Sequence, residues 1–249
     1  MKLKLLLLWV LMILTQNVFS QHKLTEMLSY ARANKQSPDS VKMNSEFLLL
    51  GTLNDYISRK YVNNEGQFDR YDPYEKLLKK YIDSVVKKAF NISLIDKGDH
   101  YVSEEMTRRM DAFYQGDRLK DGILYSSAEN KLSFLTGVYL RYGEKINNNL
   151  YKIWLRNSAK HLNCYEILKQ LGCTHIYYKH LNNIPASDFL YFEATPIIKK
   201  YFATVAVYQE KILNEQLAYH FKNSADPKEA YHKIFEREND KVQSLFEEP

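Results

Sequence analysis

The chain has 249 residues, of which 45% are hydrophobic and 26% are charged, a composition that excludes extensive disorder. Its formal net charge of +5 is too mild to indicate a nucleic-acid partner. With only 8 glycines and 6 prolines, the sequence also argues against a β-sandwich built on frequent tight turns.

The first twenty residues have the pattern of a secretory signal peptide. Lys2 and Lys4 form a positive start, the apolar run Leu5–Leu14 follows, and a small residue, Ser20, precedes the expected cleavage site before Gln21. About ten apolar residues are too few to cross a bilayer, which takes about twenty. The sequence therefore predicts a secreted or periplasmic protein with no membrane span after removal of the leader.

The remainder, residues 21–249, is predicted to fold as a single globular domain of the α+β class in which helices predominate. A helical layer is expected over about 22–145. The part at about 146–249 is expected to contain a small sheet of three to four strands, at about 150–193, that is covered by helices. The sequence has no internal repeat and no sharp shift in composition.

Apolar residues recur every three or four positions in several segments of the first half, and this spacing predicts helices. One helix is expected at 22–34 and a second from near Asn44. A third has the clearest start, because Asp72 is suited to the N-cap and Glu75 completes a capping box. Its lysines lie opposite the apolar face. Such a basic face is typical of a solvated surface, although it could also meet an anionic partner.

Two further helices are predicted before the sheet. Ser103 is expected to cap one that ends before Gly116. Residues 128–142 fit both the alternation of a strand and the stripe of a helix. Ser127 before this segment and Gly143 after it are typical of helix ends, so a helix is favoured.

The second half alternates between strands and helices. Strands are predicted at Leu150–Arg156, Thr174–His180 and Phe189–Phe192, and helices are predicted from Asn157-Ser158 to Gly172, from Thr195-Pro196 and from Asp226-Pro227. If the helix before Gly172 is continuous, Cys164 and Cys173 lie about 13 Å apart. A disulfide tolerates about 7 Å between Cα atoms, so we expect the two cysteines to remain unpaired.

No segment carries a specific catalytic, metal or cofactor signature. His161, His175 and His180 are the clustered histidines, but their spacing matches no metal-binding motif. Neither a nucleophile elbow nor a phosphate-cradling glycine loop occurs. The sequence therefore predicts no catalytic residue, no metal ligand and no cofactor.

The junction Arg156-Asn157-Ser158 is the first candidate for ligand binding. The free backbone N–H groups at a helix start, together with the charge of Arg156, are suited to an anion. The alternative is that Asn157 or Ser158 simply caps the helix while Arg156 lies in solvent.

Glu193 and Arg141 are the other two candidates. Glu193 is flanked by aromatic residues, which could raise its pKa and make it a general acid, but a lone glutamate at a strand end is usually exposed or paired. Arg141 lies beside Tyr139 and Tyr142, a combination that can grip a partner or a sugar. Its structural alternative is stacking on Tyr142.

The absence of a reactive constellation leads to the functional prediction. The chain is expected to be an exported, non-enzymatic binding or interaction protein whose unknown partner is a protein, a small molecule or a glycan outside the cytosol, and not nucleic acid. The alternative is a secreted hydrolase that acts on an envelope or environmental polymer, with Glu193 as its general acid. Whether the protein is an enzyme is left open. An enzyme should show Glu193 in a pocket with a second titratable group.

Overall fold

The computed structural model describes residues 41–55, 66–116, 118–182 and 184–247. The expected leader and the helix predicted at 22–34 lie outside these ranges. The described residues have the predicted α+β fold in which helices predominate. Residues 42–249 form one compact unit, while the predicted domain limits of 21 and 249 stay a prediction. Over the described ranges, no helix is both long enough and apolar enough to cross a membrane.

Two paired helices, α2 (Ser45–Thr52) and α5 (Ala128–Tyr142), form the centre of this unit. Each begins where the sequence predicted. The Asn44 side chain accepts hydrogen bonds from the first turn of α2, and the Ser127 side chain accepts one from Asn130 in α5. The favoured helix at 128–142 is therefore confirmed, and most of its side chains are buried, which explains why it lacks a clear polar face.

Glycine allows the two helices to touch through their backbones. A Cβ atom added to Gly51 would lie 2.1 Å from the carbonyl oxygen of Phe134, and one added to Gly137 would lie 2.0 Å from that of Leu48. Because a backbone carbonyl cannot move aside like a flexible side chain, no larger residue fits at either position. This contact brings the carboxyl ends of α2 and α5 close together.

The segment between these helices is less helical than predicted. It contains α3 (Lys76–Phe90) and α4 (Glu104–Asp111), but also a three-stranded sheet in the order β1-β3-β2 and a β4-β5 hairpin. The strands are β1 (Gln67–Arg70), β2 (Ile95–Asp96), β3 (His100–Val102), β4 (Tyr114–Gln115) and β5 (Arg118–Leu119), and the short helix η1 (Asp121–Tyr125) follows them. Strands this short offer too few positions for alternation to be recognised.

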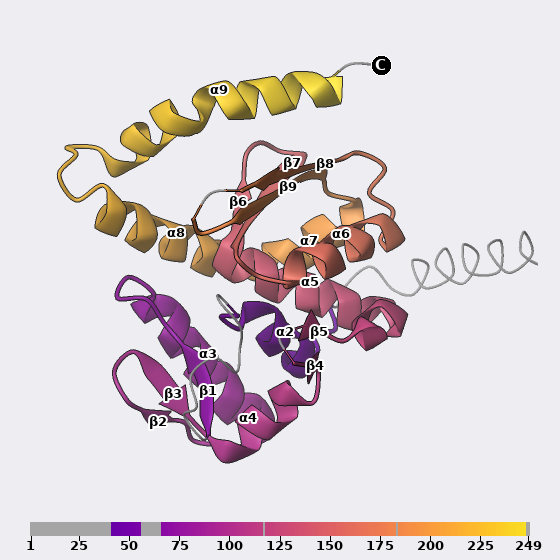
Figure 1. Cartoon of the computed structure of the whole chain (residues 1–249), viewed down its shortest axis with the longest axis vertical. Helices are drawn as coiled ribbons and strands as arrows, with labels where there is room; N and C mark the ends of the chain where they lie inside the picture. The colour runs from indigo at the N-terminus through magenta and orange to yellow at the C-terminus, as the bar shows by residue number, and fades with distance from the viewer. Residues whose placement is uncertain (1–40, 56–65, 117, 183, 248–249) are drawn as a thin grey trace, which may run out of the picture. The chain divides into compact units, whose positions relative to one another are not determined.

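The predicted sheet of the second half is confirmed. It is antiparallel with the order β6-β7-β9-β8, formed by β6 (Gly143–Lys145), β7 (Leu150–Arg156), β8 (Ile176–Leu181) and β9 (Ser187–Glu193). Helices α5, α6 (Lys160–Gln170) and α7 (Pro196–Ala203) lie on one side of this sheet (Figure 1). The last helix, α9 (Pro227–Glu247), lies across the opposite side, and α8 (Ala206–His220) precedes it.

Two helix predictions need correction. The long helix expected from Thr195-Pro196 is interrupted between α7 and α8. Helix α3 begins at Lys76, later than the Asp72 cap implied, because Asp72 provides no side-chain cap. Instead the Glu75 carboxylate accepts a hydrogen bond from the Asp72 backbone N–H at 2.9 Å. The prediction that Cys164 and Cys173 are unpaired is confirmed, because both are free and buried.

Candidate functional site

Arg141 lies at the carboxyl end of α5 and is fully engaged by the protein. Its five N–H groups donate to both carboxylate oxygens of Glu75, to Asp69 and to the backbone carbonyls of Thr52 and Arg70, at 2.6–3.0 Å. The side chain is 1% exposed. Arg141 holds the ends of α2 and α5 to the loop before α3, and no N–H of its guanidinium is left for a ligand.

Other carboxylates near these helix ends also face buried cations. Lys160 lies 3.6 Å from Asp55 and donates to the carbonyl of Leu53, while Lys152 pairs with Glu144. We call Arg141, Asp69, Glu75, Lys160 and Asp55 the helix-end cluster. Within the ranges that the structure describes, no group of three His, Cys, Asp or Glu residues is placed to hold a metal ion.

Burial makes this cluster sensitive to the loss of any partner. It raises the pKa of Glu75, although Arg141 acts in the opposite direction, and it lowers the pKa of Lys160. Both shifts disfavour the charged form of the side chain. The pairing therefore compensates charges that the interior would otherwise not tolerate.

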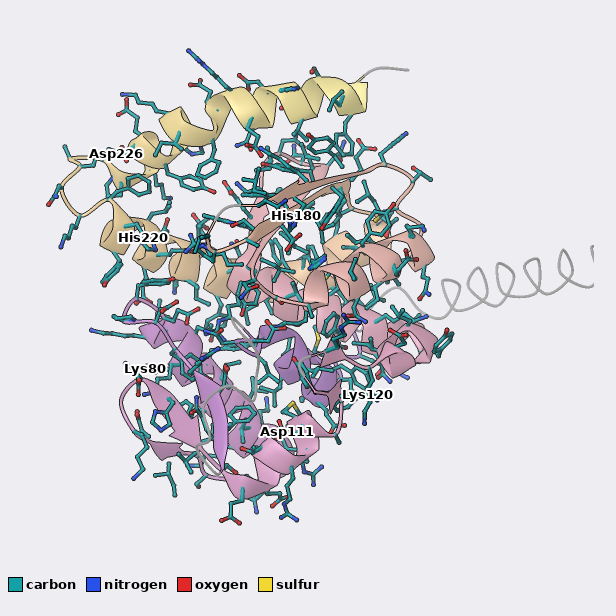
Figure 2. All side chains as sticks on the ribbon, viewed as in Figure 1. Lys80, Asp111, Lys120, His180, His220 and Asp226 are labelled. Atoms are coloured by element: carbon teal, nitrogen blue, oxygen red, sulfur yellow. The ribbon has the colours of Figure 1, made fainter. Side chains whose placement is uncertain are left out.

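A cavity of about 570 Å³ opens beside this cluster, a volume in the range of small-ligand sites. Its walls come from the residues after α2, the loop before α3, the carboxyl end of α5 with the start of β6, the strand β7, most of α8, and the first turns of α9. Figure 2 labels His220, at the end of α8, and Asp226, which caps α9. Much of the wall is aromatic. Tyr74 packs against Tyr219 and His220, with ring centroids 5.2 and 5.0 Å away.

Within the described part of the chain, two side chains that line this cavity carry hydrogen-bond donors with no protein acceptor. The Arg156 guanidinium stacks 4.1 Å above the ring of Trp154, and no carboxylate pairs with it among the described residues. The indole Nε1 of Trp154 is buried and makes no hydrogen bond. Desolvation and the positive charge of Arg156 lower the pKa of His220, which lines the same wall. The guanidinium and the indole N–H can each donate to an acceptor in the cavity, so the cavity is suited to an anionic or acceptor-rich group.

These donors belong to a larger surface of the four-stranded sheet. Strand register places Lys152 beside Tyr191, and Trp154 beside Phe189, on the side that α9 covers. We call this side the basic–aromatic face and define it by Lys152, Trp154, Arg156, Tyr177, Lys179, Phe189 and Tyr191. The cations contact the rings: Lys152 lies 6.0 Å from the centroid of Tyr191, and Lys179 lies 5.7 Å from that of Phe189.

The structure separates the three residues of the predicted junction. Asn157 is exposed, adopts a positive φ of 44° and donates its N–H to Ala186. Ser158 is buried, and its hydroxyl accepts from the Lys160 N–H at 3.2 Å. Ser158 therefore approaches the capping role that was the alternative, whereas Asn157 caps no helix, because the N-cap of α6 is Ala159. Arg156 and Ser158 both line the cavity, and Arg156 also contributes to the basic–aromatic face.

Glu193 has none of the properties of a general acid. Its side chain is 41% exposed, it lies outside the residues that line the cavity, and it pairs with His175 at 3.3 Å. The other two histidines approach one buried carboxylate, Asp188, with His161 at 3.4 Å and His180 at 2.8 Å. The prediction of a hydrolase with Glu193 as its acid is therefore wrong.

The sequence contained a signal for the basic–aromatic face that the function prediction did not use. Lys152, Trp154 and Arg156 alternate with apolar residues along β7, and this alternation places all three on one side of the strand. A tryptophan between two cations on the same side of a strand favours cation–π contacts, and Arg156 and Trp154 make one. The contributions of Tyr74 and His220 could not be found this way, because they come from distant segments of the chain.

Comparison with known proteins gives distant structural likenesses. No protein-family model and no curated protein sequence matches the chain. A crystal structure of the homing endonuclease I-DmoI in complex with DNA and Mn has a TM-score of 0.44 and 16% identity, covering 65% of this chain and 95% of that one. Full-length DUF199/WhiA from Thermatoga maritima has a TM-score of 0.38 and 14% identity, covering 83% and 71%. Likenesses this remote assign no activity to the present chain.

They do require corrections to what the sequence predicted. An exported binding protein, a secreted or periplasmic location and the exclusion of nucleic acid were expected. The similar structures are an endonuclease in complex with DNA and WhiA; these findings run against all three expectations, and none of the three is kept. The net charge averages over the whole chain, so it does not show that cations gather on one side of a single sheet.

Proposed function

We propose that this protein binds nucleic acid through the basic–aromatic face. Arg156 and Trp154 form the end of this face that opens into the cavity. The observation that carries the proposal is the Arg156 guanidinium stacked on Trp154: among the described residues, no carboxylate pairs with the guanidinium and the indole N–H makes no hydrogen bond. A guanidinium binds phosphate oxygens through charge-assisted hydrogen bonds. An indole beside it offers a surface for a nucleobase.

The aromatic rings on this face are the reason to propose nucleic acid and not another polyanion. Cations alone would suit an acidic protein or any anionic polymer equally well. Here cations alternate with rings on an antiparallel sheet, and aromatic rings on such sheets stack unpaired bases. The cavity volume of about 570 Å³ is in the range of sites for small ligands, which is the scale of a single nucleotide unit. An unpaired strand therefore fits better than a duplex, whose bases are already stacked.

The helix-end cluster supports binding rather than metal-dependent cleavage. Asp69 and Glu75 pair with Arg141, and Asp55 faces Lys160. A carboxylate whose charge is compensated by a buried cation is a poor ligand for a divalent metal, since a second cation would have to displace the first. The proposed role is therefore recognition of the strand.

Fluorescence anisotropy with labelled single-stranded and duplex DNA tests this proposal, with a mononucleotide as competitor. We expect saturable binding that weakens with salt, and Arg156→Ala to weaken it about tenfold, the value of one charge-assisted hydrogen bond. Arg118→Ala is the matched control, because Arg118 is an exposed arginine in a different sheet. Equal affinities of the two variants, or no binding of either DNA, would overturn the proposal. Binding of the mononucleotide alone would replace nucleic acid by a free nucleotide.

A further inference from the structure

Helix α9 already occupies most of the basic–aromatic face. Val242, which is 1% exposed, packs in a cluster with Leu150, Phe189 and Tyr191. Phe235 and Phe246 pack around this cluster. The rings that would stack bases are therefore covered in the present arrangement, and only the end at the cavity stays open.

Polar groups of α9 engage the cations of the same face. The Glu238 carboxylate accepts from Lys179 at 2.7 Å and from the hydroxyl of Tyr191 at 3.0 Å. The hydroxyl of Tyr231 accepts from Lys152 at 2.8 Å. An acceptor from α9 thus lies at Lys152 and another at Lys179, while Arg156 has none among the residues that the structure describes.

From these contacts we infer that α9 is a displaceable cover that competes with nucleic acid for the basic–aromatic face, with Glu238 in the place of a phosphate group. This inference rests on the proposed function. Both occupants offer the same chemistry to the face, namely an anion for Lys179 and a flat or apolar surface for the rings. They cannot occupy it together, so α9 lowers the apparent affinity by the fraction of molecules in which the face is covered.

The attachment of α9 allows it to move as one element. It contacts the sheet along one side only, and its opposite side is open to solvent, as the 61% exposure of Ile234 shows. The residues between His220 and Asp226 form turns and bends that connect it to α8 (Figure 2). The Asp226 carboxylate accepts from the backbone N–H groups of Lys228 and Glu229, so the start of α9 is capped within its own segment. Displacement would therefore leave the helix start intact.

Two full-chain variants test the inference, each with a control on the same helix. Glu238→Gln removes the charge at Lys179, and Glu236→Gln removes an exposed charge two residues away. Val242→Asp disrupts the apolar contact, whereas Ile234→Asp places the same charge on the exposed side. We expect both test variants to bind labelled single-stranded DNA about tenfold more tightly than the unmodified chain, and both controls to bind like it. Circular dichroism checks that each variant is folded.

Hydrogen exchange of the unmodified chain gives a second readout. Saturation with the oligonucleotide should increase amide exchange in α9 and decrease it in β7, β8 and β9. If DNA binds and Arg156→Ala weakens it, but Glu238→Gln and Val242→Asp bind no more tightly and α9 keeps its protection, the inference is wrong while the proposed function stands. If neither the unmodified chain nor any variant binds DNA, both are wrong.

Discussion

Arg141 and Arg156 lie fifteen positions apart in the sequence, yet they differ in how far the protein engages their guanidinium groups. Arg141 is buried and donates all five of its N–H groups to the protein. Arg156 stacks on Trp154 at the wall of a cavity and has no carboxylate partner among the described residues. The helix-end cluster therefore uses its charges to hold the fold together, whereas the basic–aromatic face has one cation, Arg156, that no carboxylate pairs with among the described residues. The comparison shows that the hydrogen-bond inventory of an arginine is a better guide to its role than its residue type.

Removal of the Arg141 charge is expected to have the largest effect, and it tests whether the helix-end cluster stabilises the fold. Arg141→Met should destabilise the protein by about 3–5 kcal/mol, because Asp69 and Glu75 would remain buried without their cation. Chemical denaturation measures the change. Arg109→Met is the control, since the exposed Arg109–Glu105 pair should contribute less than about 1 kcal/mol. A similar loss in both variants would mean that the helix-end cluster does not stabilise the fold as described.

The glycine contact that brings the helix ends together is the next test. Gly137→Ala should cost about 3 kcal/mol, because its Cβ would collide with the carbonyl oxygen of Leu48. Gly122→Ala, in η1, should change the free energy of unfolding by less than about 1 kcal/mol, since an added Cβ there meets no atom within 4 Å. A neutral Gly137→Ala would indicate that α2 and α5 are not in backbone contact.

The functional side of the comparison predicts a separation between stability and binding. Arg156→Ala should weaken DNA binding about tenfold while the free energy of unfolding changes by less than about 1 kcal/mol. Thermal unfolding and anisotropy measured on the same preparation give both quantities. A loss of stability as large as that expected for Arg141→Met would place Arg156 among the structural residues and remove the distinction.

The smallest expected effect is a titration. Burial and the Arg156 charge lower the pKa of His220, so the unfolded chain takes up this proton more readily and folding stability falls as the pH drops through the unfolded value. Arg156→Ala should raise the pKa of His220 toward its ordinary value, because a nearby positive charge is removed. NMR titration of the imidazole C–H signals measures the pKa of His220 in both proteins. An unaltered His220 pKa would show that Arg156 does not face the cavity.

Much of the fold could be predicted from the sequence, because it depends on local signals. Ser127 and Gly143 marked the limits of α5, and the β-branched and aromatic runs marked the strands β7, β8 and β9. The two- to four-residue strands between α2 and α5 escaped detection because they contain too few residues for a pattern. Glu75 fitted a capping box, but its carboxylate bonds with Arg141, sixty-six positions away, and no local rule anticipates that.

The candidate site could be predicted only in part, for the same reason. Arg156 was identified from its place at a strand end, and the alternation along β7 already placed Trp154 on its side of the strand. The cavity wall and the cover supplied by α9 depend on contacts between residues far apart in sequence. Lys179 and Glu238, for instance, are separated by fifty-nine positions. Arg141 illustrates the opposite error, since its aromatic neighbours resembled a binding pattern while its partners were distant carboxylates.

Photo-cross-linking tests the central claim most directly, because it reports where the strand lies. A single-stranded oligonucleotide with photoreactive bases would be irradiated with the full chain, and the joined peptides identified by mass spectrometry. The account predicts cross-links in β7, at Trp154 or its neighbours, and in the cavity wall around Tyr74. Cross-links confined to the exposed lysine face of α3, at Lys76, Lys80 and Lys87, would contradict it and assign the binding to that helix instead.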